Sequence, residues 1–144
     1  MGADMDPFNL ARFREAQAGV FTQARAELLA GAKRSHWMWF VFPQLRELGR
    51  SETARFYGIG SRDEAAAYLA DPELGPRLID ICEIVATNKT ATAQALFGSP
   101  DDLKLRSCAS LFAALPGAPP VFQAVLDRYF GGDPDPATLA LLRG

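Results

Sequence analysis

The chain has 144 residues, of which 49% are hydrophobic and 22% charged, a composition typical of one folded domain and not of a disordered chain. Its 15 lysines and arginines against 17 aspartates and glutamates give a net charge of −2, so we expect no nucleic-acid partner. The sequence has no run of about eighteen apolar residues, which is the length that would indicate a membrane span. We expect a single cytoplasmic domain over residues 1–144, with residues 1–7 as a disordered leader that lacks a signal-peptide pattern.

Repeated helix-start signals predict an all-α fold. Proline is tolerated in the first turn of a helix, and a short polar side chain before it caps the exposed N–H groups. Four pairs have this form: Asp6-Pro7, Asp71-Pro72, Ser99-Pro100 and Asp135-Pro136. A fifth start, Ser61 with Glu64 three residues later, has the spacing of a capping box.

The first predicted helix runs from about Phe8 to Ala30 and ends at Gly31, because apolar residues recur at helical spacing until that glycine. Gln17 falls within the apolar stripe of this helix and should point inward. Later helices are predicted near residues 52–58, 62–70, 73–87, 91–97, 100–114, 120–130 and 136–142.

Residues 35–42 are predicted to form a short buried central helix. The segment 33–44 holds both tryptophans and the only histidine, and residues 37–42 form an apolar run without a polar face. Ser35 is a candidate N-cap, and Pro43 ends the segment. We expect the run to be buried on all sides. The aromatic residues assigned to the core are Trp37, Phe40 and Phe42, while Trp39 is open to a binding role.

Polar side chains flank the aromatic run, and an unpaired buried polar group costs about 1–3 kcal/mol, so each needs a partner or a ligand. Lys104 and Ser107 lie one turn apart on a predicted helix. If that face meets the aromatic segment, the two form a polar pocket with aromatic walls, which is where small ligands bind. The candidate ligand-binding residues are Lys33, His36, Trp39, Gln44, Lys104 and Ser107.

Other chemistries lack their motifs. There is no glycine-rich phosphate loop, no dinucleotide turn and no nucleophile elbow. A single histidine excludes a histidine-rich metal site, and Cys82 and Cys108 lack the paired spacing of zinc ligands, so we expect no metal and no cofactor. Both cysteines lie in apolar helical patterns and are expected to be reduced, buried thiols. No catalytic residue is assigned.

Several motifs together resemble one family. They are Ser35–Gln44 (SHWMWFVFPQ), Tyr57–Ser61, Glu64–Leu69, Pro72–Leu78 and Asp101–Ser107. From about Asn9 to Leu142 the chain resembles a bacterial family known as domain of unknown function 1810, some members of which carry the label calpastatin. The resemblance implies one multihelical domain around an unusually short buried central helix, and the six candidate binding residues match the family pattern. Asp71 and residues 108–110 depart from it.

The first functional hypothesis is that the domain binds a small polar ligand, such as a nucleotide or an ADP-ribose-like group. Trp39 would stack on the ligand, while Lys33 and Lys104 would hold its anionic oxygens. His36 and Gln44 would orient it. No membrane partner is expected.

An enzymatic form of this hypothesis is hydrolysis of an N-glycosidic, ADP-ribosyl-type bond, by analogy with helical glycosidases. It requires an acid near the pocket, for which Glu47 and Asp101 are the candidates. The alternative is a non-enzymatic structural or protein-interaction module whose polar groups form a closed internal network. The chain is not expected to be a genuine calpain inhibitor, because such inhibition relies on disordered repeats and this sequence has none.

Overall fold

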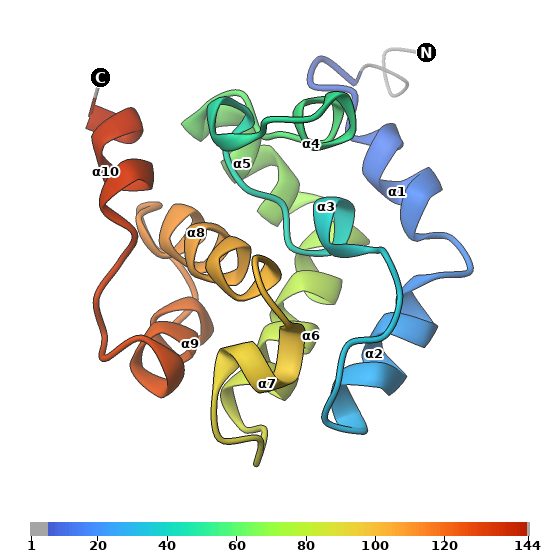
Figure 1. Cartoon of the computed structure of the whole chain (residues 1–144). Coiled ribbons are helices and arrows are strands. Elements are labelled where there is room, and N and C mark those ends of the chain that lie inside the picture. The colour runs from blue at the N-terminus through green and yellow to red at the C-terminus, as the bar shows by residue number, and fades with distance from the viewer. Residues whose placement is uncertain (1–5, 144) are drawn as a thin grey trace.

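The computed structural model describes residues 6–143, which form ten α-helices and one short 3-10 helix (Figure 1). In chain order they are α1 (Ala11–Gln17), α2 (Phe21–Leu29), α3 (Met38–Val41), η2 (Arg46–Leu48), α4 (Glu52–Phe56), α5 (Arg62–Ala70), α6 (Leu74–Ala86), α7 (Ala93–Phe97), α8 (Asp101–Ala113), α9 (Val121–Tyr129) and α10 (Pro136–Arg143). The predicted all-α fold is confirmed. Residues 1–5 of the expected leader lie outside the described residues, whereas Asp6 is described and its carboxylate accepts hydrogen bonds at the start of α1.

The helices from α4 onward agree with the predicted ranges to within about two residues, but the first predicted helix is wrong as a single element. The chain leaves the helical conformation at Ala18, whose ψ is 122°, and Gly19 has a φ of +76°. Glycine adopts this left-handed conformation without steric cost, so α1 ends there and α2 starts in a new direction. The predicted end of α2 at Gly31 is confirmed, with a φ of +94°.

Most of the predicted helix caps are also confirmed. The carboxylates of Asp71 and Asp135 each accept a 3.0 Å hydrogen bond from a backbone N–H in the first turn of α6 and α10. The Ser61 hydroxyl accepts the N–H three residues on, at 3.1 Å, as a capping box requires. Ser99 does not cap α8, which begins without a side-chain cap after Pro100.

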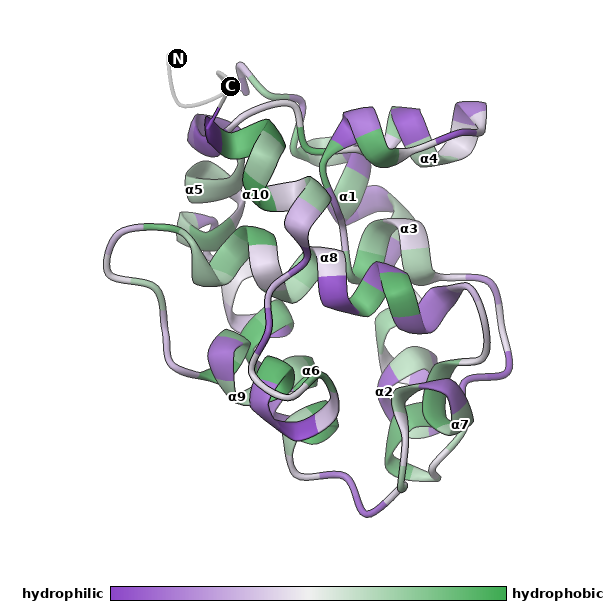
Figure 2. Cartoon of the chain, turned by 60° about the vertical axis from the view of Figure 1, so that its left-hand side comes forward, coloured by the Kyte–Doolittle hydropathy of each residue, from purple (hydrophilic) through white to green (hydrophobic). Residues whose placement is uncertain are grey.

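The core lies where α6 and α8 pack against α9, with α5 against α6 and α7 against α8. Figure 2 shows hydrophilic and hydrophobic residues alternating along the first turns of α8, the end of that helix that leaves the core for the surface. The largest fully buried side chains are Trp37, Tyr68, Phe13, Phe42, Phe112 and Phe122.

Within residues 6–143, no helix has both the length and the apolarity that crossing a bilayer requires.

The short central helix is confirmed, but it spans only the four residues of α3 and not 35–42. Ser35 is not its N-cap, because Trp37 holds that position without a side-chain cap, and the Ser35 hydroxyl is bonded to Glu27. Trp37 and Phe42 lie in the core as predicted. Trp39 and Phe40 are only half-buried, so burial of the run on all sides is wrong. A helix of one turn packed on α1 buries one side and leaves the other near the surface.

The buried polar side chain of Gln17 is paired within the core. The Gln17 amide, 2% exposed, donates to the Phe40 carbonyl oxygen at 2.7 Å and to the Tyr68 hydroxyl at 3.1 Å, which ties α1 to α3 and α5. The inward orientation predicted for Gln17 is therefore confirmed. Cys82 and Cys108 are free and fully buried, and this burial raises the pKa of both thiols. They are inert core residues.

Candidate functional site

A groove of about 480 Å³ lies between the first half of α8, the segment 44–54 and the start of α10. Three of the six predicted binding residues line it, and they come from two parts of the chain about sixty positions apart: Gln44, Lys104 and Ser107. The other lining residues are Leu48, Gly49, Arg50, Ser51, Ala54, Pro100, Leu103, Asp135 and Ala137. A larger hollow of about 550 Å³ between the end of α2 and the loop after α6 has one titratable side chain, Lys89, and so offers little chemistry.

The α8 wall of the groove carries a hydroxyl beside a carboxylate. The Ser107 Oγ donates to the Leu103 carbonyl oxygen at 3.2 Å and lies 3.5 Å from Asp135 Oδ2. Asp135 is fixed in place because the same oxygen accepts the Thr138 N–H at 3.0 Å and its hydroxyl at 2.6 Å. Sequence reasoning identified Asp135 as a helix cap and did not foresee that capping places it in the groove.

Lys104 is partly committed to the protein. Its ammonium nitrogen lies 3.5 Å from Asp101 Oδ1, one turn back on α8, and 5.5 Å from the centre of the Trp39 ring. Its side chain is 26% exposed. An ammonium group has three donors, and a contact of 3.5 Å is at the long end for a charge-assisted hydrogen bond. The charge of Lys104 therefore remains available to the groove that it lines.

Lys33 lies behind Lys104 and does not line the groove. Its ammonium nitrogen donates to the Ser35 carbonyl oxygen at 2.6 Å, lies 2.9 Å from Asp101 Oδ2 and is 5.0 Å from the centre of the Trp37 ring. Only 7% of its side chain is exposed. Asp101 thus contacts both lysines. Of the two, Lys33 is the one that is buried and bound within the protein.

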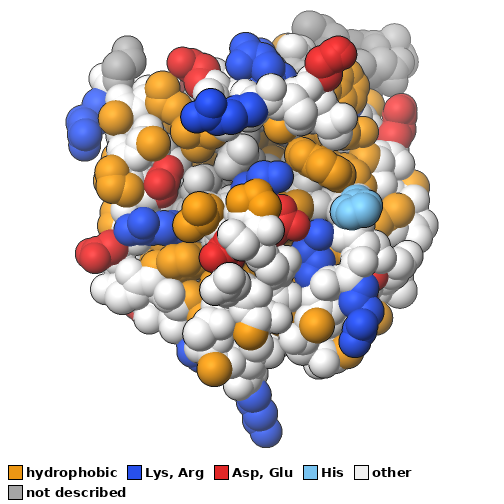
Figure 3. Space-filling model, in the orientation of Figure 1, with side chains coloured by type: hydrophobic (Ala, Val, Ile, Leu, Met, Phe, Trp, Pro, Cys, Tyr) orange, Lys and Arg blue, Asp and Glu red, His pale blue; other side chains and the backbone are white. Residues whose placement is uncertain are grey.

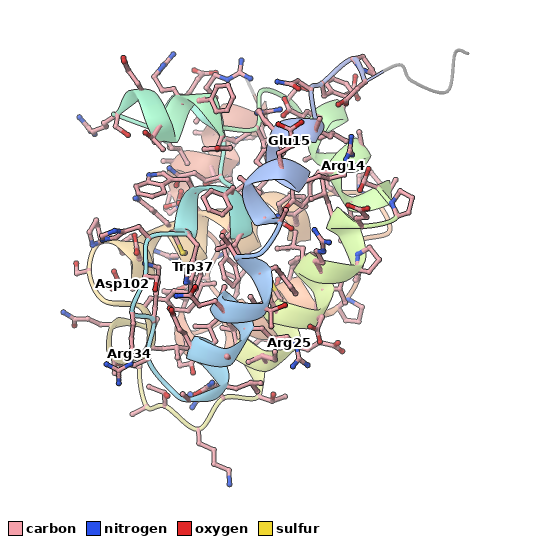
Figure 4. The ribbon with its side chains drawn as sticks, turned by 90° about the vertical axis from the view of Figure 1, so that its right-hand side faces the viewer. Arg14, Glu15, Arg25, Arg34, Trp37 and Asp102 are labelled. Carbon is pink, nitrogen blue, oxygen red and sulfur yellow. The ribbon has the colours of Figure 1, made fainter. Side chains whose placement is uncertain are left out.

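The loop between α2 and α3, which carries Lys33, is organised by Glu27. The Glu27 carboxylate accepts hydrogen bonds from the N–H groups of Arg34 and Ser35, from the Ser35 hydroxyl at 2.6 Å and from the Trp37 indole at 2.9 Å. Burial would raise the pKa of this carboxyl, but these hydrogen bonds together with that of Gln23 lower it to about 2. Figure 4 shows Trp37 within the molecule and Arg34 at its edge. No pattern in the sequence indicated this role of Glu27, because its partners are spread over a loop of irregular conformation.

Of the two remaining candidates, Gln44 lines the groove and His36 does not. The Gln44 backbone carbonyl accepts the Ile59 N–H at 2.9 Å beside the parallel bridge between Leu45 and Ile59, but among residues 6–143 its side-chain amide has no hydrogen-bond partner. His36 is exposed, with its ring 6.5 Å from that of Trp39, and it does not line the groove. Figure 3 shows the sole histidine, in pale blue, on the same face as a mixed group of acidic and basic side chains.

The two acids considered for catalysis are not placed alike. Glu47 is exposed on η2 and outside the groove lining, and Asp101 is held by two lysines. The acid that does line the groove is Asp135. Within the described part of the chain, no three His, Cys, Asp or Glu side chains are grouped so as to hold a metal ion.

Comparison with known proteins gives a family and a neighbour of the same fold. The family model described as a protein of unknown function (DUF1810) matches residues 7–142. The crystal structure of the conserved hypothetical protein Rv1873 from Mycobacterium tuberculosis is similar over 96% of this chain and 99% of that one, with 50% sequence identity and a TM-score of 0.94. A search of the curated proteins found no match.

Proposed function

This chain belongs to the DUF1810 family, and we propose that it binds a small anionic, nucleotide-like ligand in the groove between α8 and residues 44–54. The observation that carries the proposal is the position of Lys104, a partly exposed cation. It lines the groove together with the side-chain amide of Gln44, which has no hydrogen-bond partner in the described part of the chain. Ligand sites typically combine an apolar cleft with a few convergent polar groups of this kind.

The proposal gives the candidate residues two kinds of role. Lys104 holds an anionic oxygen of the ligand, while Gln44 and Ser107 donate or accept hydrogen bonds beside it. Trp39 is a positioning residue, because its ring lies against the Lys104 ammonium group and not in the groove lining. Lys33 acts through Asp101, which it fixes in front of Lys104.

Arg50 adds to the positive charge of the groove, and Asp135 offsets part of it. A ligand that carries both an anion and hydroxyl groups suits this distribution, because Asp135 accepts hydrogen bonds and Lys104 and Arg50 donate them. This is the basis for a nucleotide or a sugar phosphate as the ligand class.

A ligand screen by thermal shift tests the proposal, with nucleotides, ADP-ribose, nicotinamide dinucleotides and sugar phosphates as probes. A ligand at a hundred times its dissociation constant stabilises the fold by about 2.7 kcal/mol. We expect Lys104→Ala to remove the stabilisation, whereas Lys89→Ala, an exposed lysine in the hollow beside α2, should retain it. Absence of any shift over the panel, or an equal shift in Lys104→Ala, would contradict the proposal.

One observation favours the alternative of a closed polar network for part of this region. Lys33 is 7% exposed and its contacts are all internal, so Lys33→Ala should lower the free energy of unfolding even without ligand. Lys104→Ala should leave it nearly unchanged. If both variants destabilise the fold equally and no ligand binds, the network alone accounts for the region.

Hydrolysis of an N-glycosidic bond is the reaction to assay with any ligand found. Asp135 is the groove carboxylate that such a reaction would use as its acid or base. Release of nicotinamide or of free ADP-ribose, compared between the wild type and Asp135→Asn, is the readout. Binding without turnover would make the domain a ligand sensor.

A further inference from the structure

A second pocket, of about 270 Å³, lies where the segment before α1 meets η2 and α4. None of the residues that line this pocket also lines the groove. Three arginines and two phenylalanines line it, and among residues 6–143 no acidic side chain does. The lining residues are Phe8, Asn9, Arg12, Arg46, Arg55 and Phe56.

The floor of this pocket is the guanidinium group of Arg12, whose hydrogen-bonding capacity is fully used. Its five N–H groups donate to the carbonyl oxygens of Phe8, Asn9, Phe56 and Gly58 and to Glu64 Oε2, at 2.6 to 2.9 Å. The side chains of Arg12 and Glu64 are 5% and 4% exposed. Glu64 therefore neutralises Arg12, and the pair serves as a rigid base.

The charges of Arg46 and Arg55 are not neutralised in the same way. Arg46 Nη2 lies 3.9 Å from Glu64 Oε1 and 3.4 Å from the Gly58 carbonyl oxygen, and its side chain is 46% exposed. Arg55 is exposed and has no ion pair or side-chain hydrogen bond with any residue of the described chain. Since Glu64 is already paired with Arg12, two positive charges face one small pocket without a matching anion among residues 6–143.

Arg46 is held in position by its backbone. Its N–H donates to the Ile59 carbonyl oxygen at 2.8 Å, and a Cβ added at Gly58 would lie 2.3 Å from the Arg46 Cα. Only glycine permits this close approach of the two segments. The strand-like contact that places Gln44 in the groove therefore also fixes Arg46 at the second pocket.

The aromatic wall of the pocket is unusually open. Phe56 is 55% exposed, one of only three large hydrophobic side chains so exposed in the described residues, and its ring meets Tyr57 edge to face at 4.8 Å. Asn9, beside it, has a φ of +52° and is the one described non-glycine residue in the left-handed region. Exposed apolar surface at the rim of a pocket often marks a binding site.

We propose that this pocket binds a small aromatic oxyanion, that is, a carboxylate or phosphate attached to a flat ring. Arg46 and Arg55 pair with the anion, and a guanidinium fork suits both oxyanions. Phe56 and Phe8 contact the ring. The anion supplies the charge that the pocket lacks, and the ring covers Phe56.

Titration calorimetry of the full chain with phenyl phosphate and with benzoate tests this second site. We expect at least one of the two to bind, more tightly than inorganic phosphate or phenol, which each lack half of the recognition. Arg55→Ala should weaken binding by about tenfold, the effect of losing one charged hydrogen-bonding partner. Arg34→Ala, an exposed arginine on the loop after α2, is the matched control and should bind as the wild type does.

Lys104→Ala should also bind these probes as the wild type does, which separates this site from the groove. Arg46→Ala should weaken binding as Arg55→Ala does. Because Arg46 approaches buried Glu64, the test rests on Arg55→Ala if Arg46→Ala unfolds. Failure of both probes to bind, or equal affinity in Arg55→Ala and Arg34→Ala, would overturn the proposal.

Discussion

Arg12 and Lys104 each lie beside a carboxylate and an aromatic ring, yet their surroundings differ. Arg12 is 2.6 Å from Glu64 Oε2 with its guanidinium carbon 4.3 Å from the centre of the Phe13 ring. Lys104 is 3.5 Å from Asp101 Oδ1 and 5.5 Å from the Trp39 ring. The first side chain is 5% exposed, the second 26%. A cation, a carboxylate and an aromatic ring thus form a buried ion pair at Arg12, which we call the closed anchor. At Lys104 the same kinds of group form a partly exposed wall of the groove, which we call the open wall.

The difference shows how burial decides what a charge does. A fully buried charge must have all its donors satisfied, since each unmet one costs free energy, and so it has nothing left for a ligand. A half-exposed charge keeps water as a partner, and a ligand replaces that water at little cost. Structural charges are therefore recognised by complete pairing, and ligand-binding charges by incomplete pairing at a concave surface.

The largest effect is expected at the closed anchor. Glu64→Gln leaves the Arg12 guanidinium buried without its counter-charge, which costs about 3–5 kcal/mol of the free energy of unfolding. Urea denaturation measures the loss. Asp80→Asn, which breaks the exposed Arg25–Asp80 pair, is the control and should leave the midpoint close to that of the wild type. A small effect of Glu64→Gln would contradict the assignment of Arg12 and Glu64 as a buried ion pair that depends on both charges.

A smaller, pH-dependent effect is expected at Glu27, which orders the loop between α2 and α3. The pKa of this carboxyl falls from 4.5 to about 2 on folding. A lowered pKa stabilises the fold at pH values above 4.5, and the contribution is lost as the pH falls toward 2. The full difference corresponds to on the order of 3 kcal/mol, and partial solvation of the site reduces it to about 2 kcal/mol.

Urea denaturation of the wild type and of Glu27→Gln between pH 7 and pH 2.5 measures this contribution. The wild type should lose the Glu27 contribution over the acidic part of this range, and the variant should show a correspondingly shallower decline. Glu15→Gln is the matched control, because Glu15 is exposed on α1 and has no side-chain partner among the described residues. Parallel pH profiles of wild type and Glu27→Gln would contradict the assignment.

Most helix positions were predictable because the residues that start each helix act locally. Asp71, Ser61 and Asp135 act as caps through N–H groups two to three residues away, so the signal and its effect lie in the same short window. Gly19 shows the limit of this reasoning. It lies within an apolar pattern that continues through α1 and α2, yet the left-handed turn there separates two helices that pack on different partners, α1 on α3 and α2 on α6.

The candidate site was predictable only in part, because it is assembled from distant segments. Lys104 and Ser107 were found from their spacing on one helix, and both line the groove. Arg50 and Asp135 were missed as site residues, since the first follows an irregular turn and the second already had a role as a cap. The ion pair of Lys33 with Asp101 joins residues that lie nearly half the chain apart, which no local pattern records.

The smallest effect is expected at His36, the residue that tests how far the open wall extends. Its side chain is exposed, and its ring lies 6.5 Å from that of Trp39 between ring centres. His36→Ala should change the free energy of unfolding by no more than about 0.5 kcal/mol, as is usual for exposed positions. Trp39→Ala, in contrast, should weaken ligand binding, because it removes the ring against which Lys104 lies. Calorimetric titration of both variants with a ligand from the screen gives the comparison. A loss of affinity in His36→Ala as large as that in Trp39→Ala would place His36 in contact with the ligand and extend the binding surface beyond the groove.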